Sequence, residues 1–249
     1  MIGRAQVAGL PLLVLLLLPL VALFGATDLS DLQRAANDPL FWAAIRTSAW
    51  TTALSLLFVV GLGTPLAWGL ARSCGKGAHL AERLIDLPII MPPAVVGLGL
   101  LIAFAPVGLA LTGAAVVIAQ TVVAAPFYVH AAVAAFRRID PDMLLVSRTL
   151  GRSPTQAFWS VALPVALPAL VGGAGVAWAR ALGEFGATLL FAGSLQGVTQ
   201  TAPLGVYAAM ATDLRLAIAL ALVMVVAGAG VLALLHLGAR RWWLQEDAR

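Results

Sequence analysis

The sequence is poor in the residues on which most soluble enzymes and secreted domains depend. Its 249 residues contain a single cysteine, Cys74, and three histidines, and only 10% of them are charged. One cysteine excludes an intrachain disulfide framework and a metal site made of several cysteines, so we expect Cys74 to be a small residue at a helix end. Hydrophobic residues make up 61% of the chain, which excludes the usual composition of a water-soluble domain.

The basic residues do not indicate a nucleic-acid partner. The formal charge is +4, but Lys and Arg are spread among short segments between apolar runs and form no single patch. The segment Gly75-Lys76-Gly77 is not a phosphate loop, because Leu70 and Gly77 stand where that pattern needs a glycine and a Ser or Thr. We therefore expect no cofactor on this chain, and ATP and magnesium would belong to a partner subunit.

Long apolar runs are abundant, and the mean hydropathy is +0.99. A bilayer core of about 30 Å needs roughly 20 apolar residues per helix. The sequence predicts an all-α polytopic membrane protein with about six transmembrane helices in a single domain, 1–249. The expected spans are 10–26, 45–71, 84–105, 111–136, 168–192 and 214–237. The first run could also be a signal peptide, but no clean cleavage site follows it, so an anchor is favoured.

The distribution of Lys and Arg predicts the orientation in the membrane. Six spans place both termini on one side, and eleven of the fifteen basic residues fall on that side. Those eleven are Arg4, Arg72, Lys76, Arg83, Arg137, Arg138, Arg148, Arg152, Arg240, Arg241 and Arg249. The basic side is expected to be cytoplasmic, with both termini on it.

The longest polar stretch, 137–160, is longer than a connection between two spans requires. Asp140 and Pro141 are typical of a helix start, and Gly151 and Pro154 would end that helix. A second short helix is expected from Thr155 to Val161, before a further proline. From the residues alone, the stretch is either a docking site for a partner or an interfacial loop with no partner.

The same stretch resembles the EAA loop of binding-protein-dependent ABC importer permeases. The matching residues are Ser147-Arg-Thr-Leu-Gly151 and, after nine residues, Val161-Ala-Leu163-Pro164. The resemblance implies a type I importer permease, in which this loop is a coupling helix in a groove of the cytoplasmic ATPase. The implied coupling residues are Ser147, Arg148, Leu150, Gly151, Arg152, Val161, Leu163 and Pro164.

One departure from the EAA pattern is plain. Leu145, Val146 and Ser147 stand where the family carries Glu-Ala-Ala. Because the glutamate is missing, docking would depend on shape, on apolar contact, and on Arg148 or Arg152.

A second resemblance concerns the substrate. The segments 87–97, 183–188 and 199–204 look like those of the molybdate and tungstate permeases, with sulfate and thiosulfate permeases as nearest relatives. This implies import of molybdate or tungstate across the inner membrane of a bacterium or archaeon. The implied partners are a second copy of the chain, an ABC ATPase dimer and an extracytoplasmic oxyanion-binding protein, in membrane lipid.

The candidate pathway and gate residues are Pro92, Pro93, Arg180, Glu184 and Thr188. The two prolines can break a membrane helix along a pathway. Arg180 and Glu184 are four residues apart on one helix face, so they are expected to pair, either as a gate or as a structural ion pair. His130 has no second ligand at helical spacing, so we expect a hydrogen-bonded packing residue and no metal site.

Two other functions remain as alternatives. A membrane-embedded enzyme would need a cluster of titratable or metal-binding groups at membrane depth, and no such catalytic set is visible in the sequence. An ATP-independent secondary transporter would usually show an internal repeat and more intramembrane ion-coupling residues. The expected role is therefore a translocation subunit, with sulfate or thiosulfate import and secondary transport as alternatives.

Overall fold

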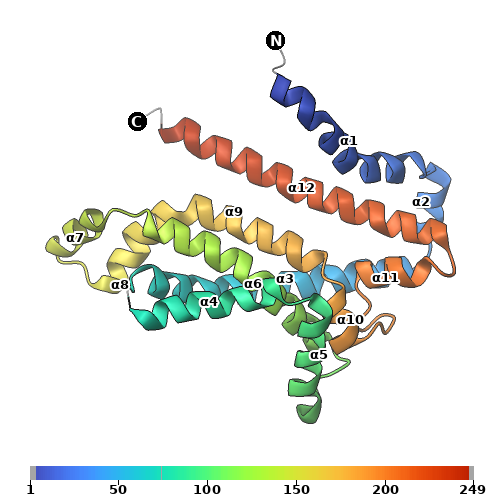
Figure 1. Ribbon diagram of the computed structural model, residues 1–249, viewed down its shortest axis with the longest axis horizontal. Helices are drawn as coiled ribbons and strands as arrows, with labels where there is room; N and C mark the ends of the chain where they lie inside the picture. Colours follow the sequence, from blue (N-terminus) through green and yellow to red (C-terminus); the bar gives the residue numbers. More distant parts are fainter. Residues whose placement is uncertain (1–3, 74, 247–249) are drawn as a thin grey trace.

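The computed structural model describes residues 4–73 and 75–246, and every regular element in these ranges is helical. Five long helices share roughly one direction (Figure 1): α1 (Arg4–Gly25), α3 (Pro39–Ala71), α6 (Gly113–Arg137), α9 (Leu163–Leu182) and α12 (Leu214–Glu246). Cys74, expected at a helix end, and Arg249, counted on the basic side, lie outside the described residues.

Shorter elements connect or extend the long helices. They are α2 (Leu29–Ala36), α4 (Lys76–Ile90), α5 (Pro93–Phe104), η1 (Ala105–Val107), α7 (Pro141–Thr149), α8 (Pro154–Ala157), the π-helical turn η2 (Phe158–Ala162), α10 (Gly186–Ala192) and α11 (Ala202–Ala209). In Figure 1, α7 and α8 lie at one end of the molecule, and α2, α10 and α11 lie toward the other.

Four helical stretches are long and apolar enough to cross a membrane, or six if each of two bent helix pairs counts as one span. The four are Pro39–Ala71, Gly113–Arg137, Pro154–Leu182 and Leu214–Val231. The bent pairs are α1 with α2, at 75°, and α4 with the segment Pro93–Val107, at 109°.

The expected ranges 84–105 and 168–192 both contain a break. The first is divided at Met91 and Pro92, because two consecutive prolines remove two backbone donors. The second is interrupted at 183–185, between α9 and α10. Toward its other end, α9 continues back through η2 into α8, so that helical stretch begins well before residue 168.

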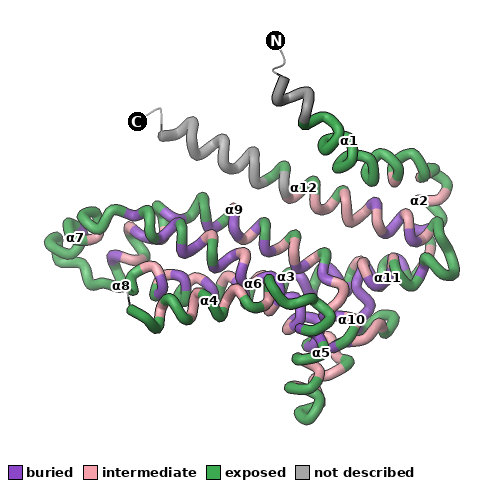
Figure 2. Tube along the Cα trace, in the orientation of Figure 1, coloured by how far each residue is buried: buried purple, intermediate pink, exposed green. Residues whose placement is uncertain are grey.

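The core lies around α6, the most deeply buried of the long helices (Figure 2). Small residues let α3 and α9 approach it closely. A Cβ on Gly63 would lie 2.8 Å from the Tyr128 ring, and a Cβ on Gly173 would lie 2.6 Å from the Ala131 methyl group. The Tyr128 hydroxyl lies 2.6 Å from that of Thr64. Close helix packing of this kind is typical of membrane interiors. No hydrophobic driving force acts between helices there, and small residues allow the close van der Waals contact that holds them together.

Hydroxyl groups on α3 join the helices at the end away from α7. Ser55 donates to the Val117 carbonyl oxygen over 3.0 Å, and its hydroxyl lies 3.1 Å from the Gln120 side-chain oxygen. Ser48 accepts the Ala202 backbone N–H at 2.6 Å, at the start of α11. These buried bonds fix α6 and α11 against α3, because a broken one would leave a polar group unpaired in an apolar interior.

The crossing of α5 and α10 is the tightest backbone contact at this end. A Cβ on Gly97 would lie 2.6 Å from the Ala187 carbonyl oxygen, and a Cβ on Gly186 would lie 3.1 Å from Cβ of Pro93. Because the atoms near Gly97 belong to backbone, no side-chain rotation can make room.

Replacing Gly97 with alanine should therefore destabilise the protein by about 1–3 kcal/mol, the usual cost of overpacking. The expected result is a melting temperature several degrees lower in detergent. Gly99→Ala is the matched control, because no described atom lies within 4 Å of a Cβ at that position on the same helix. Equal melting temperatures for the two variants would contradict the close contact.

Candidate functional site

The segment 140–152 folds as a short, well-capped helix followed by a sharp bend. The Asp140 carboxylate accepts the Asp142 N–H at 2.9 Å and begins α7. At the other end, Gly151 adopts a left-handed conformation with φ of +86°. Its N–H donates to the Arg148 carbonyl at 3.0 Å, and the Arg152 N–H donates to the Ser147 carbonyl at 3.3 Å. This pair of bonds is a Schellman motif, which needs a residue tolerant of positive φ at its centre.

A second helix, α8, begins at Pro154, directly after this bend. The Ser153 side chain caps the Gln156 N–H at 3.2 Å, and the Gln156 side chain accepts the Ser153 N–H at 2.8 Å. The expected stop at Pro164 does not occur. Leu163 donates its N–H to the Phe158 carbonyl, five residues earlier, so the turn before Pro164 is wider than an α-helix. A wider turn relieves the clash that a proline ring makes with the preceding turn.

The implied coupling residues therefore divide into two groups. Val161 lies in η2, and Leu163 and Pro164 begin α9, so these three belong to a continuous membrane helix. The other five lie in α7 and the bend after it: Ser147, Arg148, Leu150, Gly151 and Arg152. Ser147 is buried, and the other four are exposed.

The outer surface of α7 is apolar, although it lies outside the bundle of long helices. Leu145 and Val146 are each 57% exposed, and Leu150 is 77% exposed. Arg148 and Arg152 border the same shallow hollow as Leu145 and form no ion pair with any described residue. A cluster of large apolar side chains beside unpaired cations is typical of a protein interaction site.

Aromatic contacts join this loop to the bundle. The Trp68 ring on α3 lies 5.3 Å from Phe136 on α6 and 5.1 Å from Phe158 in η2, measured between centroids. The Arg72 guanidinium lies 4.7 Å from the Trp68 ring, within cation-π range. A displacement of η2 would therefore push directly on α3 and α6.

The pathway and gate candidates lie toward the opposite end, around the crossing of α5 and α10. Arg180 Nη2 lies 2.8 Å from Glu184 Oε2, as the i, i+4 spacing predicted. Glu184 is 1% exposed, and its Oε1 accepts the Ala187 N–H at 2.8 Å, so the carboxylate joins α9 to the first turn of α10. A buried carboxylate in this position is neutralised by the cation and by the helix N-terminus together.

The remaining candidates surround that junction. Thr188 is fully buried, and its hydroxyl has no hydrogen-bond partner among the described residues. Pro92 and Pro93 are both exposed at the bend between α4 and α5, and Pro93 lies next to Gly186. The structure thus brings Pro93, Glu184 and Thr188 to one region, and their role in gating stays a prediction.

Two ion pairs between α4 and α6 were not foreseen from the sequence. His130 Nε2 lies 2.5 Å from Asp86 Oδ1, and the Arg137 guanidinium contacts the Glu82 carboxylate. His130 was expected as a hydrogen-bonded packing residue; it is hydrogen-bonded to Asp86, but its side chain is 46% exposed rather than packed in the core. The spacing of Glu82 and Asp86 on one face of α4 was the available signal, and it was obscured because the expected span began at residue 84.

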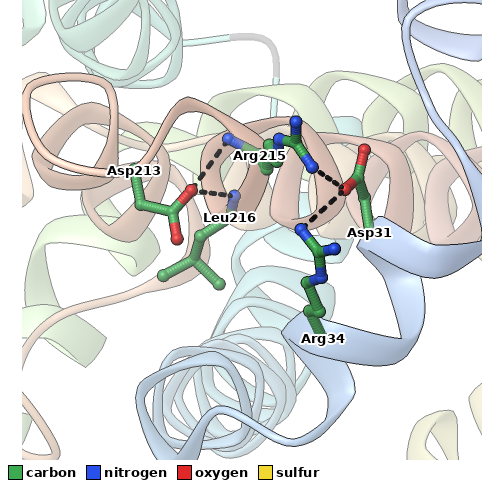
Figure 3. Close-up of polar contacts among 5 residues, drawn as sticks. All are labelled: Asp31, Arg34, Asp213, Arg215 and Leu216. Carbon is green, nitrogen blue, oxygen red and sulfur yellow. Dashed lines mark hydrogen bonds and ion pairs between the residues drawn. The ribbon is translucent and has the colours of Figure 1, made fainter.

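A further charged cluster lies at the end away from α7 (Figure 3). Arg215 Nη1 donates to Asp31 Oδ1 at 2.9 Å, and Arg34 Nη1 lies 3.9 Å from the same oxygen. Asp213 accepts the N–H groups of Arg215 and Leu216 at 3.0 and 3.2 Å, which caps α12. The cluster ties α2 to the first turn of α12.

Comparison with known proteins agrees with this geometry. Residues 60–243 match the family described as binding-protein-dependent transport system inner membrane component. The molybdenum transport system permease protein ModB of Mycobacterium tuberculosis is 42% identical over 246 residues, covering 90% of this chain and 92% of the relative. The molybdate/tungstate transport system permease protein WtpB of Pyrococcus furiosus is 41% identical over 177 residues, covering 70% and 71%.

Solved structures share the fold at low sequence identity. A bacterial ABC transporter involved in the import of the acidic polysaccharide alginate matches with a TM-score of 0.74 and 16% identity over 95% of each chain. The MetNI methionine ABC transporter matches with a TM-score of 0.66 and 20% identity over 82% of this chain and 98% of that one. The chain therefore belongs to the binding-protein-dependent transport system inner membrane components, and it is a multi-pass translocation subunit rather than an ATPase.

Proposed function

We propose that this permease imports molybdate or tungstate, as a homodimer with an ABC ATPase dimer and an extracytoplasmic oxyanion-binding protein. The observation that carries the proposal is the 42% identity to a molybdenum permease over 90% of the chain. Sulfate or thiosulfate import is the alternative within the same family. Family membership and the α7 surface both argue against transport without an ATPase.

The mechanism follows from where the exposed and the fixed parts of the chain lie. The α7 surface is apolar, cationic at one edge and free of any described partner, so it is suited to a groove in the ATPase. When the ATPase subunits close, movement of α7 would pass through η2 to Trp68 and Phe136, and so to α3 and α6. Alternating access would result from rotation of these helices against the second copy.

The orientation we propose places α7 and both termini in the cytoplasm, in the inner membrane of a bacterium or archaeon. The excess of Lys and Arg on that side supports it. The Asp31, Arg34 and Arg215 cluster would then lie on the extracytoplasmic side, where the binding protein docks.

Selectivity among oxyanions is assigned mainly to the binding protein. Arg180 is paired with Glu184, so this cation is neutralised and Glu184 would repel an anion. A tight anion site at this junction is therefore disfavoured, so an oxyanion that passes it would not be retained.

The test is ATP hydrolysis by the permease reconstituted with its ATPase and binding protein, comparing molybdate, tungstate and sulfate. The expected result is stimulation of several fold by molybdate or tungstate and none by sulfate. Stimulation by sulfate alone would replace the proposed substrate with the alternative. If no ATPase copurifies with the permease and no anion stimulates hydrolysis, the importer assignment itself fails.

A further inference from the structure

The helix α4 is attached to the rest of the chain mainly by polar contacts rather than by buried side chains. All of its residues are described, and none is buried. Its apolar contacts with the core come from three partly buried side chains, Ala78, Ala81 and Ile85. Its specific contacts are the two ion pairs with α6, which join Asp86 to His130 and Glu82 to Arg137. We call these four residues the α4–α6 charge strip.

The charge strip extends into the membrane from the α7 end of the molecule. Asp86 lies ten residues after Lys76, the first residue of α4, which corresponds to about 15 Å along the helix. His130 lies seven residues, or about 10 Å, before Arg137 at the end of α6. The outer pair, Glu82 with Arg137, is therefore near the membrane surface, and the inner pair, Asp86 with His130, lies at membrane depth.

The inner pair is too exposed in the single chain to face lipid. The side chains of Asp86 and His130 are 43% and 46% exposed. Ionisable groups at membrane depth face a bundle interior or a water-filled cavity, because exposure to hydrocarbon is costly. The surface that carries the strip must therefore face water or protein.

We propose that the α4–α6 charge strip lines the cytoplasmic half of the anion pathway and opens as the anion passes. This inference rests on the proposed function. With both pairs closed, Arg137 is neutralised by Glu82 and the His130 ring is occupied by Asp86, so no anion is held. When α4 moves away from α6, the carboxylates of Glu82 and Asp86 leave, and the oxyanion becomes the counter-ion of Arg137 and can accept a hydrogen bond from the His130 ring.

Two features of α4 allow that movement. Because no side chain of α4 is fully buried, displacing α4 breaks only the partly buried contacts of Ala78, Ala81 and Ile85 with the core. The 109° bend after Ile90 separates α4 from the following helix, so α4 can shift without moving the tightly packed crossing of α5 and α10. An element with few buried contacts is the kind that moves in transport cycles.

The test measures water access and local charge on the strip in the complete transporter in proteoliposomes. Ala134 is exposed, and its position one turn from His130 and three residues before Arg137 places it on the same face of α6. In a Cys74→Ser background, Ala134→Cys is expected to react with water-soluble methanethiosulfonate reagents. Leu62→Cys is the control, because Leu62 is 68% exposed on an apolar face of α3 and is expected to face lipid and stay unlabelled.

The ratio of labelling by an anionic and a cationic reagent then reports the local charge. Asp86→Asn and Glu82→Gln should each raise the anionic-to-cationic ratio several fold, and Arg137→Gln should lower it. Asp31→Asn, in the cluster at the opposite end, is expected to leave the ratio unchanged.

The inference is overturned if Ala134→Cys stays unlabelled, as it would in a dry contact with a second copy, or if Leu62→Cys is labelled equally. It is also overturned if the labelling ratio does not change when charged residues of the strip are replaced. Labelling does not depend on which oxyanion stimulates the ATPase. If Ala134→Cys is labelled but molybdate and tungstate do not stimulate ATP hydrolysis, the result counts against the proposed substrate and not against the charge strip.

Discussion

Replacing Gly151 with proline should abolish oxyanion-stimulated ATP hydrolysis and copurification of the ATPase. Proline fixes φ near −65°, whereas Gly151 has φ of +86°. Proline also removes the N–H that donates to the Arg148 carbonyl, so the bend after α7 cannot form. Gly151→Ala should weaken coupling only partly, because no described atom would touch its Cβ and the cost is about 1–2 kcal/mol of backbone strain.

Gly108→Pro is the matched control for this prediction. Gly108 also has positive φ, +72°, a hydrogen-bonded N–H and open space around it, but it follows η1 in a loop far from α7. The same chemical damage at that position should leave ATPase copurification intact. If Gly151→Pro copurifies with the ATPase and couples normally, α7 is not the docking helix.

Replacing Glu184 with alanine should lower the free energy of unfolding more than any other substitution considered for stability. It leaves Arg180 without its partner and the Ala187 N–H without an acceptor in a buried junction. Breaking one side of a buried pair typically costs about 3–5 kcal/mol. Glu184→Gln keeps an acceptor for Ala187 and should cost less. The melting temperature in detergent is expected to fall in the order wild type, Glu184→Gln, Glu184→Ala.

The double variant Arg180→Gln, Glu184→Gln separates stability from transport. Removing both charges leaves no unpaired ion, so this variant should melt above Glu184→Ala. A double variant as unstable as Glu184→Ala would contradict pairing as the cause. If it is stable and transports normally, the pair is structural, whereas a stable variant that leaks or fails to transport assigns the pair to the gate.

The helix and bend of residues 140–152 were predictable because their signals are local. Asp140 with Pro141 marks a helix start, and Gly151 marks the bend, within a dozen residues of each other. The Arg180 and Glu184 pair was predictable for the same reason, since the two residues are only four positions apart, although Glu184 lies just beyond the end of α9. Local spacing determines such contacts whatever the rest of the chain does.

A break at Pro92 and Pro93 was expected from the sequence, but its angle and the break in the fifth expected span were harder to predict. Apolar residues flank both breaks, so a hydropathy pattern continues across them, and only the local backbone distinguishes a kink from a turn of 109°. The pairs of Glu82 with Arg137 and Asp86 with His130 join residues 55 and 44 positions apart. No periodicity in one sequence specifies contacts at that distance, because they depend on how α4 rests on α6.

The π-helical turn η2 also sets a rotational phase between two parts of the molecule. Successive residues in an α-helix are about 100° apart around its axis. A five-residue turn holds about one residue more than an α-helical turn, so everything before Phe158 is rotated relative to α9. Deleting one residue there, such as Ser160, would turn the docking face of α7 through roughly that angle without changing any residue on it. An insertion or deletion at this turn would therefore change the direction of the exposed α7 surface without any substitution on α7.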